Sequence, residues 1–402
     1  MSANLSFDAE AAIERLMRFL AVGGITGQEK KIAADVAKAL VEVGVPKKAI
    51  AYDKANEAIP LPTQTGNLIV QLPGTVVGPR LLFSSHLDTV PLAGGAVPVR
   101  DKQKIRPEGR TALGGDNRTG VAVLVTLAAT LIAKKLPHPP LTLLFTVREE
   151  SGLFGARHLD PADLGGVVMG FNVDGRQPAE FTTGAVGAER WEAAIHGKAS
   201  HAGAHPEQGI SATLIAALAL AEVQKKGWFG KVSQAGREGS SNVGSFGGLD
   251  GRCAGDATNV VTDYVRITGE ARSHDTKFVK EIVKAYREAF ASAREQVTDD
   301  KGKKAKVEFT SRIDYYPFKL KDTEPVIQHT QAAATAAGFT PTLRTSNGGL
   351  DANWLVRHGI PTVTFGAGQN AIHTVEEWVD LDLYLGGCKM ALALATRTAG
   401  AG

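Results

Sequence analysis

The sequence predicts an α/β protein in which a mainly parallel sheet is interrupted by a smaller α+β domain. Short β-rich apolar segments alternate with helical segments up to residue 186 and again after residue 317, as in a parallel sheet covered by helices. Between residues 187 and 316 the predicted order is β-α-β-β-α-β, which is typical of a ferredoxin-like unit. The length of 402 residues also exceeds the size at which one hydrophobic core usually stops growing, which favours two domains.

The larger predicted domain is discontinuous and comprises residues 1–186 and 317–402. Its expected strands are the apolar segments NLIVQL (67–72), RLLFSS (80–85), LTLLFTV (141–147), GVVMGFNV (166–173) and PTVTF (361–365). The longest apolar run, Val121–Ala133, is too short to span a bilayer and ends at two lysines, so it predicts a buried helix. A helical pattern at 323–339 leads back into the sheet.

The smaller predicted domain comprises residues 187–316. Its expected strands are RWEAAIHG (190–197), NVGSF (242–246), TNVVTDYVRITGEAR (258–272) and KVEFTSRI (306–313). One helix is expected at 211–226 and another from about Asp275, which can cap a helix with Phe278, Ile282 and Ala289 on one face. Because such a sheet exposes an edge strand, we predict that two copies of the chain pair through it.

The composition is that of an ordinary soluble protein. The 45 basic and 42 acidic residues are largely interspersed, which predicts no nucleic-acid partner, and the N-terminus lacks the apolar core of a signal peptide. Only two cysteines, Cys253 and Cys388, are present, and they match neither a disulfide framework nor a metal-binding CxxC motif. We therefore expect a cytoplasmic protein without a membrane partner.

Histidines and carboxylates follow the predicted strands of the larger domain. They are His86, Asp88, Asp116, Glu149, Glu150, Asp174 and His373. Each taken alone could be a turn residue, a helix start or a solvated charge. Together they share the carboxyl edge of an open α/β sheet, where sites form, and without cysteine they suit zinc and also admit cobalt or manganese.

Two metal ions explain these groups better than one. A single catalytic zinc takes three protein ligands and a water, which would leave groups unused. With Asp116 bridging, each of two ions would have one histidine, one terminal carboxylate and a shared carboxylate and water. Glu149 then remains as a free carboxylate beside a ligand, which makes it the natural general base.

Eight short motifs follow one another along the chain. They are SSHLDTVP, GGDNRTG, TVREESGLFGA, NVDG, GKASHAGAHPEQG, TNVV…GEARSHD, GGLDANW and IHTVEEW. This series resembles the co-catalytic zinc exopeptidase family that contains peptidase T, aminoacylases, glutamate carboxypeptidases and succinyl-diaminopimelate desuccinylase. The resemblance covers nearly the whole chain and looks closest to the peptidase T-like branch.

The resemblance implies how the site residues divide between two zinc ions. It places His86 and Asp174 on one ion, Glu150 and His373 on the other, and Asp116 between them. It also implies that Asp88 orients a ligand and that Glu149 is the base. The more common form of the bridging motif has Asp and Lys where this chain has Asn117 and Arg118, a departure that lowers the local negative charge without removing a ligand.

The resemblance also implies three roles in the smaller domain of a homodimer. Arg272 would grip a substrate carboxylate or carbonyl, Asn259 would assist, and His201 would reach into the partner subunit's site to stabilise the oxyanion. The alternative without a catalytic role is that Arg272 forms a salt bridge at a strand end and that His201 is an ordinary loop residue.

The resulting hypothesis is a zinc-dependent hydrolase that cleaves peptide bonds of short peptides, acting as an aminopeptidase. An N-acyl-amino-acid amidohydrolase or a carboxypeptidase is the alternative, because these enzymes would rely on Arg272 for a substrate carboxylate. A non-catalytic metal-binding relative would gain nothing from the free base Glu149.

Overall fold

The computed structural model describes residues 5–248, 253–255 and 257–397, which form two compact units. Unit 1 comprises the described residues up to Gly184, then Lys319–Ser346, and those from Leu350 onward. Unit 2 comprises the described residues of Ala185–Phe318 together with Asn347–Gly349. Unit 2 is therefore inserted in the sequence of unit 1.

Unit 1 is built around one nine-stranded sheet in the order β1-β2-β6-β3-β7-β16-β8-β14, with β15 also paired to β8. Its strands are β1 (Ile50–Tyr52), β2 (Leu68–Leu72), β3 (Leu81–His86), β6 (Leu141–Thr146), β7 (Met169–Val173), β8 (Glu180–Ala185), β14 (Phe318–Lys319), β15 (Thr342–Ser346) and β16 (Thr362–Phe365). Its helices are α1 (Ala9–Leu20), α2 (Lys30–Glu42), α3 (Ala55–Ala58), α4 (Gly115–Lys134), α5 (Phe154–Arg157), α8 (Pro325–Ala336), α9 (Asp351–Arg357) and α10 (Leu381–Thr396).

The four central strands, β6, β3, β7 and β16, run parallel, so their carboxyl ends share one edge of the sheet. Every residue in these strands is buried, which explains why they appear in the sequence as continuous apolar runs. The flanking strands β2 and β8 are antiparallel to them. The predicted fold class, a mainly parallel α/β sheet, is confirmed.

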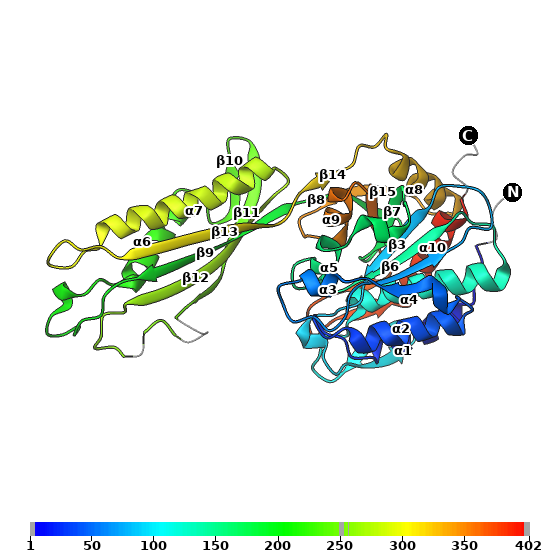
Figure 1. The fold of residues 1–402 in the computed structure, drawn as a ribbon, viewed down its shortest axis with the longest axis horizontal. Coiled ribbons are helices and arrows are strands. Elements are labelled where there is room, and N and C mark those ends of the chain that lie inside the picture. Colours follow the sequence, from blue (N-terminus) through cyan, green and yellow to red (C-terminus); the bar gives the residue numbers. More distant parts are fainter. Residues whose placement is uncertain (1–4, 249–252, 256, 398–402) are drawn as a thin grey trace. The chain divides into compact units, whose positions relative to one another are not determined.

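Helix α4 is the core helix of unit 1. By length and composition it is the one described helix that could cross a membrane, yet 89% of its apolar window is buried. It packs on strand β3 and against helices α1 and α10. Figure 1 shows α1, near the N-terminus, and α10, near the C-terminus, beside α4. The predicted buried helix over Val121–Ala133 is confirmed, with an additional first turn that carries Asp116.

A second, four-stranded sheet in unit 1 was not predicted from the sequence. Its order is β17-β18-β5-β4, and its strands are β4 (Val97–Asp101), β5 (Lys104–Glu108), β17 (Gln369–Asn370) and β18 (Trp378–Asp380). Strands β4 and β5 are largely exposed and each contains a proline, and β17 and β18 are only two and three residues long, so the hydrophobic pattern of a strand is missing.

Unit 2 is a five-stranded antiparallel sheet in the order β10-β11-β12-β9-β13, with two helices on one face (Figure 1). Its elements are β9 (Gly187–His196), α6 (Ala212–Lys225), β10 (Gly230–Gln234), β11 (Arg237–Gly247), β12 (Tyr264–Ser273), α7 (Thr276–Gln296) and β13 (Lys306–Tyr315). Asp275 caps α7 by accepting the backbone N–H groups of Lys277 and Phe278. The core between helices and sheet centres on Trp191, whose ring lies 4.5 Å from that of Tyr286.

Strand β10 corrects the predicted order, which becomes β-α-β-β-β-α-β. It forms a hairpin with β11 through a two-residue turn, Ala235–Gly236, in which both residues have positive φ. Such a turn usually shows itself in a sequence as Asn-Gly or Asp-Gly, and this chain has alanine at the first position. The flanking residues also carry little hydrophobic pattern, so the extra strand has no recognisable signal in the sequence.

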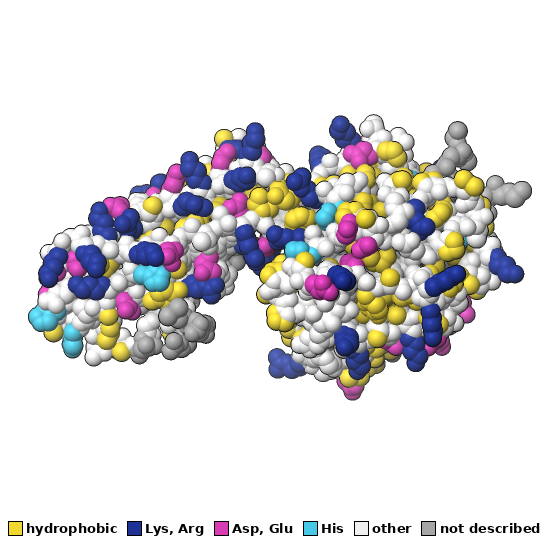
Figure 2. Space-filling view, in the orientation of Figure 1, with side chains coloured by type: hydrophobic (Ala, Val, Ile, Leu, Met, Phe, Trp, Pro, Cys, Tyr) yellow, Lys and Arg dark blue, Asp and Glu magenta, His cyan; other side chains and the backbone are white. Residues whose placement is uncertain are grey.

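The outer face of the unit 2 sheet is polar. Charged residues on neighbouring strands pair across it, as Arg266 of β12 does with Glu192 of β9 at 2.6 Å. Figure 2 shows basic and acidic side chains interspersed on the visible face of both units.

Candidate active site

The carboxyl edge of the parallel strands gathers the acidic and histidine side chains of unit 1. His86 is the last residue of β3, Glu149 and Glu150 follow β6, and Asp174 follows β7 directly. Asp116 lies in the first turn of α4, and His373 lies between β17 and β18. Residues far apart in the sequence therefore meet because parallel strands end at the same edge.

These side chains form two groups of three potential ligands, and Asp116 belongs to both. One group is His86, Asp116 and Asp174, and the other is Asp116, Glu150 and His373; within each, the donor atoms lie within 4.8 Å of one another. Asp116 Oδ1 lies 3.1 Å from His86 Nε2, and its Oδ2 lies 3.3 Å from His373 Nε2. A carboxylate that turns one oxygen to each group has the geometry of a bridging ligand.

Glu149 lies beside the first group but belongs to neither. Its Oε2 is 4.0 Å from His86 Nε2, and its side chain is largely buried. Glu150, the next residue, instead contacts His373, with 2.9 Å between Oε1 and Nε2. Two adjacent glutamates therefore have different surroundings.

The site holds more buried negative charge than the two histidines can neutralise. Burial raises the pKa of Glu149 and of Asp174 well above their ordinary values, and it raises the pKa of Glu150 to about 7. Although burial opposes it, hydrogen bonds from His373 and His86 hold the pKa of Asp116 below its ordinary value. Buried carboxylates are costly unless a cation pairs with them, so the cluster is suited to bind cations.

Both histidines respond to the surrounding carboxylates. Hydrogen bonds to Asp116 and Glu150 raise the pKa of His373 to about 10. Burial alone would lower the pKa of His86, but Glu149, Asp116 and Asp88 hold it well above its ordinary value. The imidazoles occupy a strongly negative environment.

Asp88 does more than the sequence predicted. It was expected to orient His86, and its Oδ1 lies 3.4 Å from His86 Nδ1, but its own backbone carbonyl is closer to that nitrogen, at 3.0 Å. The carboxylate accepts the backbone N–H groups of Glu149 at 3.0 Å and Glu150 at 3.1 Å. Through these two hydrogen bonds the fully buried Asp88 fixes the backbone of both glutamates.

Glu29, a buried glutamate that was not predicted as a site residue, supports the same segment. Glu29 Oε1 accepts the backbone N–H of Gly27 at 2.6 Å and that of Arg148 at 3.1 Å. Gly27 has a φ of 83°, a backbone conformation that favours glycine, and a Cβ there would also crowd the guanidinium of Arg148, 2.2 Å from its Nη2. A glutamate near a helix start carries no sequence signal of such a contact.

The two departures in the bridging motif have structural roles. Asn117 donates to the carbonyl of Val173 at 2.7 Å and accepts from Gln369 at 2.9 Å. Arg118 is buried and donates to the carbonyls of Val22 and Gly24. Neither replaces a member of the two ligand groups.

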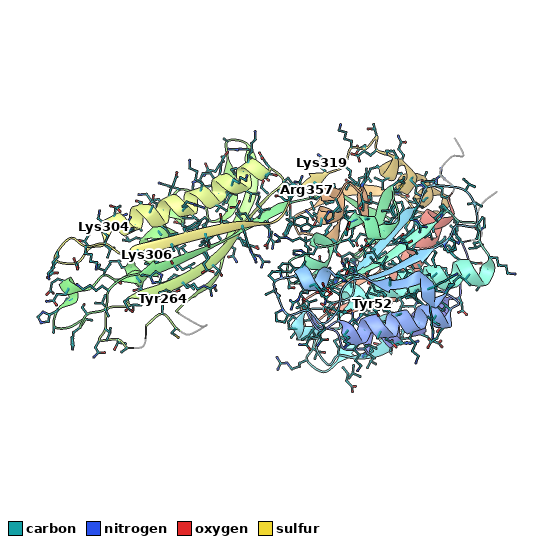
Figure 3. All side chains as sticks on the ribbon, in the orientation of Figure 1. Tyr52, Tyr264, Lys304, Lys306, Lys319 and Arg357 are labelled. Carbon is teal, nitrogen blue, oxygen red and sulfur yellow. The ribbon has the colours of Figure 1, made fainter. Side chains whose placement is uncertain are left out.

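The three predicted residues of unit 2 lie at opposite ends of its sheet. His201 and Asn259 are neighbours, because the N–H of Ala202 donates to the carbonyl of Asn259 at 2.9 Å. Arg272 lies near the other end of β12, where its Nε is 2.9 Å from Glu270 Oε1. Tyr264 and Arg272 are eight residue steps apart along β12, about 26 Å at roughly 3.3 Å per step. Figure 3 labels Tyr264 and Lys306, which mark the end of the sheet nearer to Asn259.

Comparison with known proteins identifies the family. Residues 82–397 match the family described as peptidase family M20/M25/M40. The chain belongs to this family. This M20/M25/M40 peptidase is 34% identical over 335 residues to the uncharacterized protein YqjE of Bacillus subtilis, covering 83% of this chain and 85% of that protein.

Two solved structures resemble the peptidase over almost its full length. Aminopeptidase PepT from Bacillus cereus is 31% identical with a TM-score of 0.81, and a tripeptidase from Staphylococcus aureus is 28% identical with a TM-score of 0.85. Each comparison covers 97% of this chain and 98% of the other. The predicted resemblance to the peptidase T-like branch and the assignment to the metallopeptidases are confirmed.

Proposed function

We propose that this peptidase uses a pair of divalent metal ions to remove N-terminal residues from short peptides. The observation that carries the proposal is the shared carboxylate of Asp116, which joins two three-donor groups at the carboxyl edge of the sheet. The names of two similar proteins, aminopeptidase PepT and a tripeptidase, support an aminopeptidase of short peptides.

The donor set fits two ions. His86 and Asp174 would hold one, Glu150 and His373 the other, and Asp116 both. Nitrogen and carboxylate donors without sulfur suit zinc and also admit cobalt or manganese, and we propose zinc. When bound, two such cations polarise a peptide carbonyl and lower the pKa of water.

Glu149 is the proposed general base. Its carboxylate accepts a proton from the attacking water as the water oxygen bonds to the scissile carbonyl carbon. It then donates this proton to the nitrogen of the leaving amine as the C–N bond breaks. Asp88 holds the backbone of Glu149 during these steps, and burial of Glu149 favours its protonated form between them.

Turnover of a matched peptide panel tests the substrate class. The panel contains one tripeptide with free ends, the same tripeptide acetylated at its N-terminus, and the same tripeptide amidated at its C-terminus. We expect hydrolysis of the free and the amidated peptides, with release of the first residue. Preference for the acetylated peptide would instead favour the N-acyl-amino-acid amidohydrolase, and release of the last residue would favour a carboxypeptidase.

We also propose that unit 2 forms a homodimer and that His201 acts in the partner's site. His201 Nδ1 accepts the backbone N–H groups of Gly203 and Ala204, which places the ring proton of the neutral imidazole on Nε2, a donor suited to an oxyanion. Arg272 lies about 26 Å along β12 from Tyr264, which marks the end of the strand nearer to His201 and Asn259. This separation supports a division in which the two ends of unit 2 serve different sites.

A cytoplasmic location of the protein stays a prediction.

Mixing two inactive variants tests the role of His201. A dimer of one His201→Ala chain and one Glu149→Gln chain contains one site with a native Glu149 and a donated His201. If chains exchange at random, we expect recovery of about a quarter of the wild-type rate per site. Exchange is checked with labelled chains. Activity that stays at the level of the separate variants despite exchange, or a monomeric native protein, would contradict the proposal.

A further inference from the structure

One buried carboxylate outside the two ligand groups binds the backbone that carries Asp116. Glu377 is 1% exposed and lies immediately before β18. Its Oε2 accepts the N–H groups of Leu113 and Gly114, both at 2.9 Å, and its Oε1 accepts the N–H of Asp116 at 3.0 Å. Three backbone donors at the start of α4 thus converge on one side chain.

The glycines of the bridging motif make room for this contact. A Cβ on Gly115 would lie 2.8 Å from Val379 Cγ2 and 3.2 Å from Glu377 Oε1. Gly114 has a φ of 78°, a conformation that other residues rarely adopt. The two glycines that precede Asp116 therefore allow the turn to close on Glu377.

Glu377 is itself fixed to the segment that carries His373. Its backbone N–H donates to the carbonyl of Thr374, the residue after His373, at 3.2 Å. The next residues form β18, which pairs with both β17 and β5. The backbone of Glu377 is therefore bonded to the turn that follows His373, and its carboxylate is bonded to the turn that carries Asp116.

We propose that Glu377 is a positioning residue that sets the bridging carboxylate of Asp116 relative to His373, and thereby sets the affinity of the metal pair. The inference rests on the proposed dinuclear function. Outer groups that orient metal ligands change metal affinity when they are altered, even though they do not touch the ion. The negative charge of Glu377 close to Asp116 adds to the attraction for cations.

The substitution Glu377→Gln removes the charge and one acceptor at almost constant volume. A glutamine can accept at one of the two oxygen positions only, so at least one of the three N–H groups then faces an amide donor. Keeping the two bonds to Leu113 and Gly114 leaves the N–H of Asp116 without its acceptor. Glu376→Gln is a matched control, because Glu376 is the adjacent residue, has the same chemistry and is exposed.

The test is calorimetric titration of Zn²⁺ into the metal-free full chain, with the visible spectrum of the Co²⁺ form and the thermal unfolding of the metal-free form measured in parallel. We expect Glu377→Gln to weaken binding of at least one ion by about 10- to 100-fold and to change the Co²⁺ spectrum. Glu376→Gln should match the wild type. Gly115→Ala, whose added methyl group crowds Glu377, should also weaken metal binding. This variant replaces Glu377→Gln in the test if Glu377→Gln does not fold.

The outcomes separate this inference from the proposed function. Wild-type affinity for two ions in Glu377→Gln or in Gly115→Ala would overturn the positioning role alone. A lower unfolding temperature with unchanged metal affinity would likewise overturn it, since that is the result of a purely structural role. A wild-type chain that binds no metal pair would overturn the proposed function, and this inference with it.

Discussion

Glu149→Gln is expected to reduce turnover of a short peptide by about 10³-fold or more while two metal ions stay bound per chain. General acid–base catalysis typically contributes 10² to 10⁴-fold, and glutamine cannot accept or return the proton. The ligand groups do not include Glu149, so metal content should not change. Peptide turnover and elemental analysis of the same sample check this result.

Glu150→Gln is the matched control for that variant. Glu150 is the neighbouring residue of the same type, but it contacts His373 and belongs to the second ligand group. We expect this variant to lose affinity for one ion. If Glu149→Gln lost a metal equivalent and Glu150→Gln retained both, the roles of the two glutamates would be exchanged.

Asp116→Ala is expected to abolish turnover and to weaken the binding of both ions, by at least about 100-fold, because one carboxylate serves both groups. His373→Ala should weaken only one ion, since His373 belongs to one group. Calorimetric metal titration of the two variants compares them directly. Full occupancy in His373→Ala would contradict its role as a ligand, and loss of a single ion in Asp116→Ala would contradict the bridge.

Much of the unit 1 sheet, and the gathering of the candidate site residues at its carboxyl edge, was predictable from the sequence. The strands β3, β6, β7 and β16 are buried on both faces, so they appear as apolar runs, and a His or carboxylate after such a run is conspicuous. Parallel strands then bring these residues to one edge without further information. The resemblance carried by the ordered series of motifs added the proposed division of these residues between two ions.

The supporting carboxylates were not predictable in the same way. Glu29 and Glu377 act on backbone N–H groups of residues more than 100 positions away, and a backbone donor leaves no residue type to recognise in the sequence. The small sheet that carries β18 was missed because β17 and β18 are only two and three residues long and β4 and β5 are largely exposed. Strand β10 was missed because its turn uses Ala235 at a position with positive φ.

Reconstitution of the metal-free enzyme tests the central claim most directly. The chelated wild-type protein is titrated with Zn²⁺ while the hydrolysis of a free tripeptide is followed. We predict no turnover in the chelated protein and activity that rises until two equivalents per chain are bound, as expected for two ions that share Asp116. Full turnover by the chelated protein, or activity that is complete at one equivalent, would contradict a dinuclear peptidase.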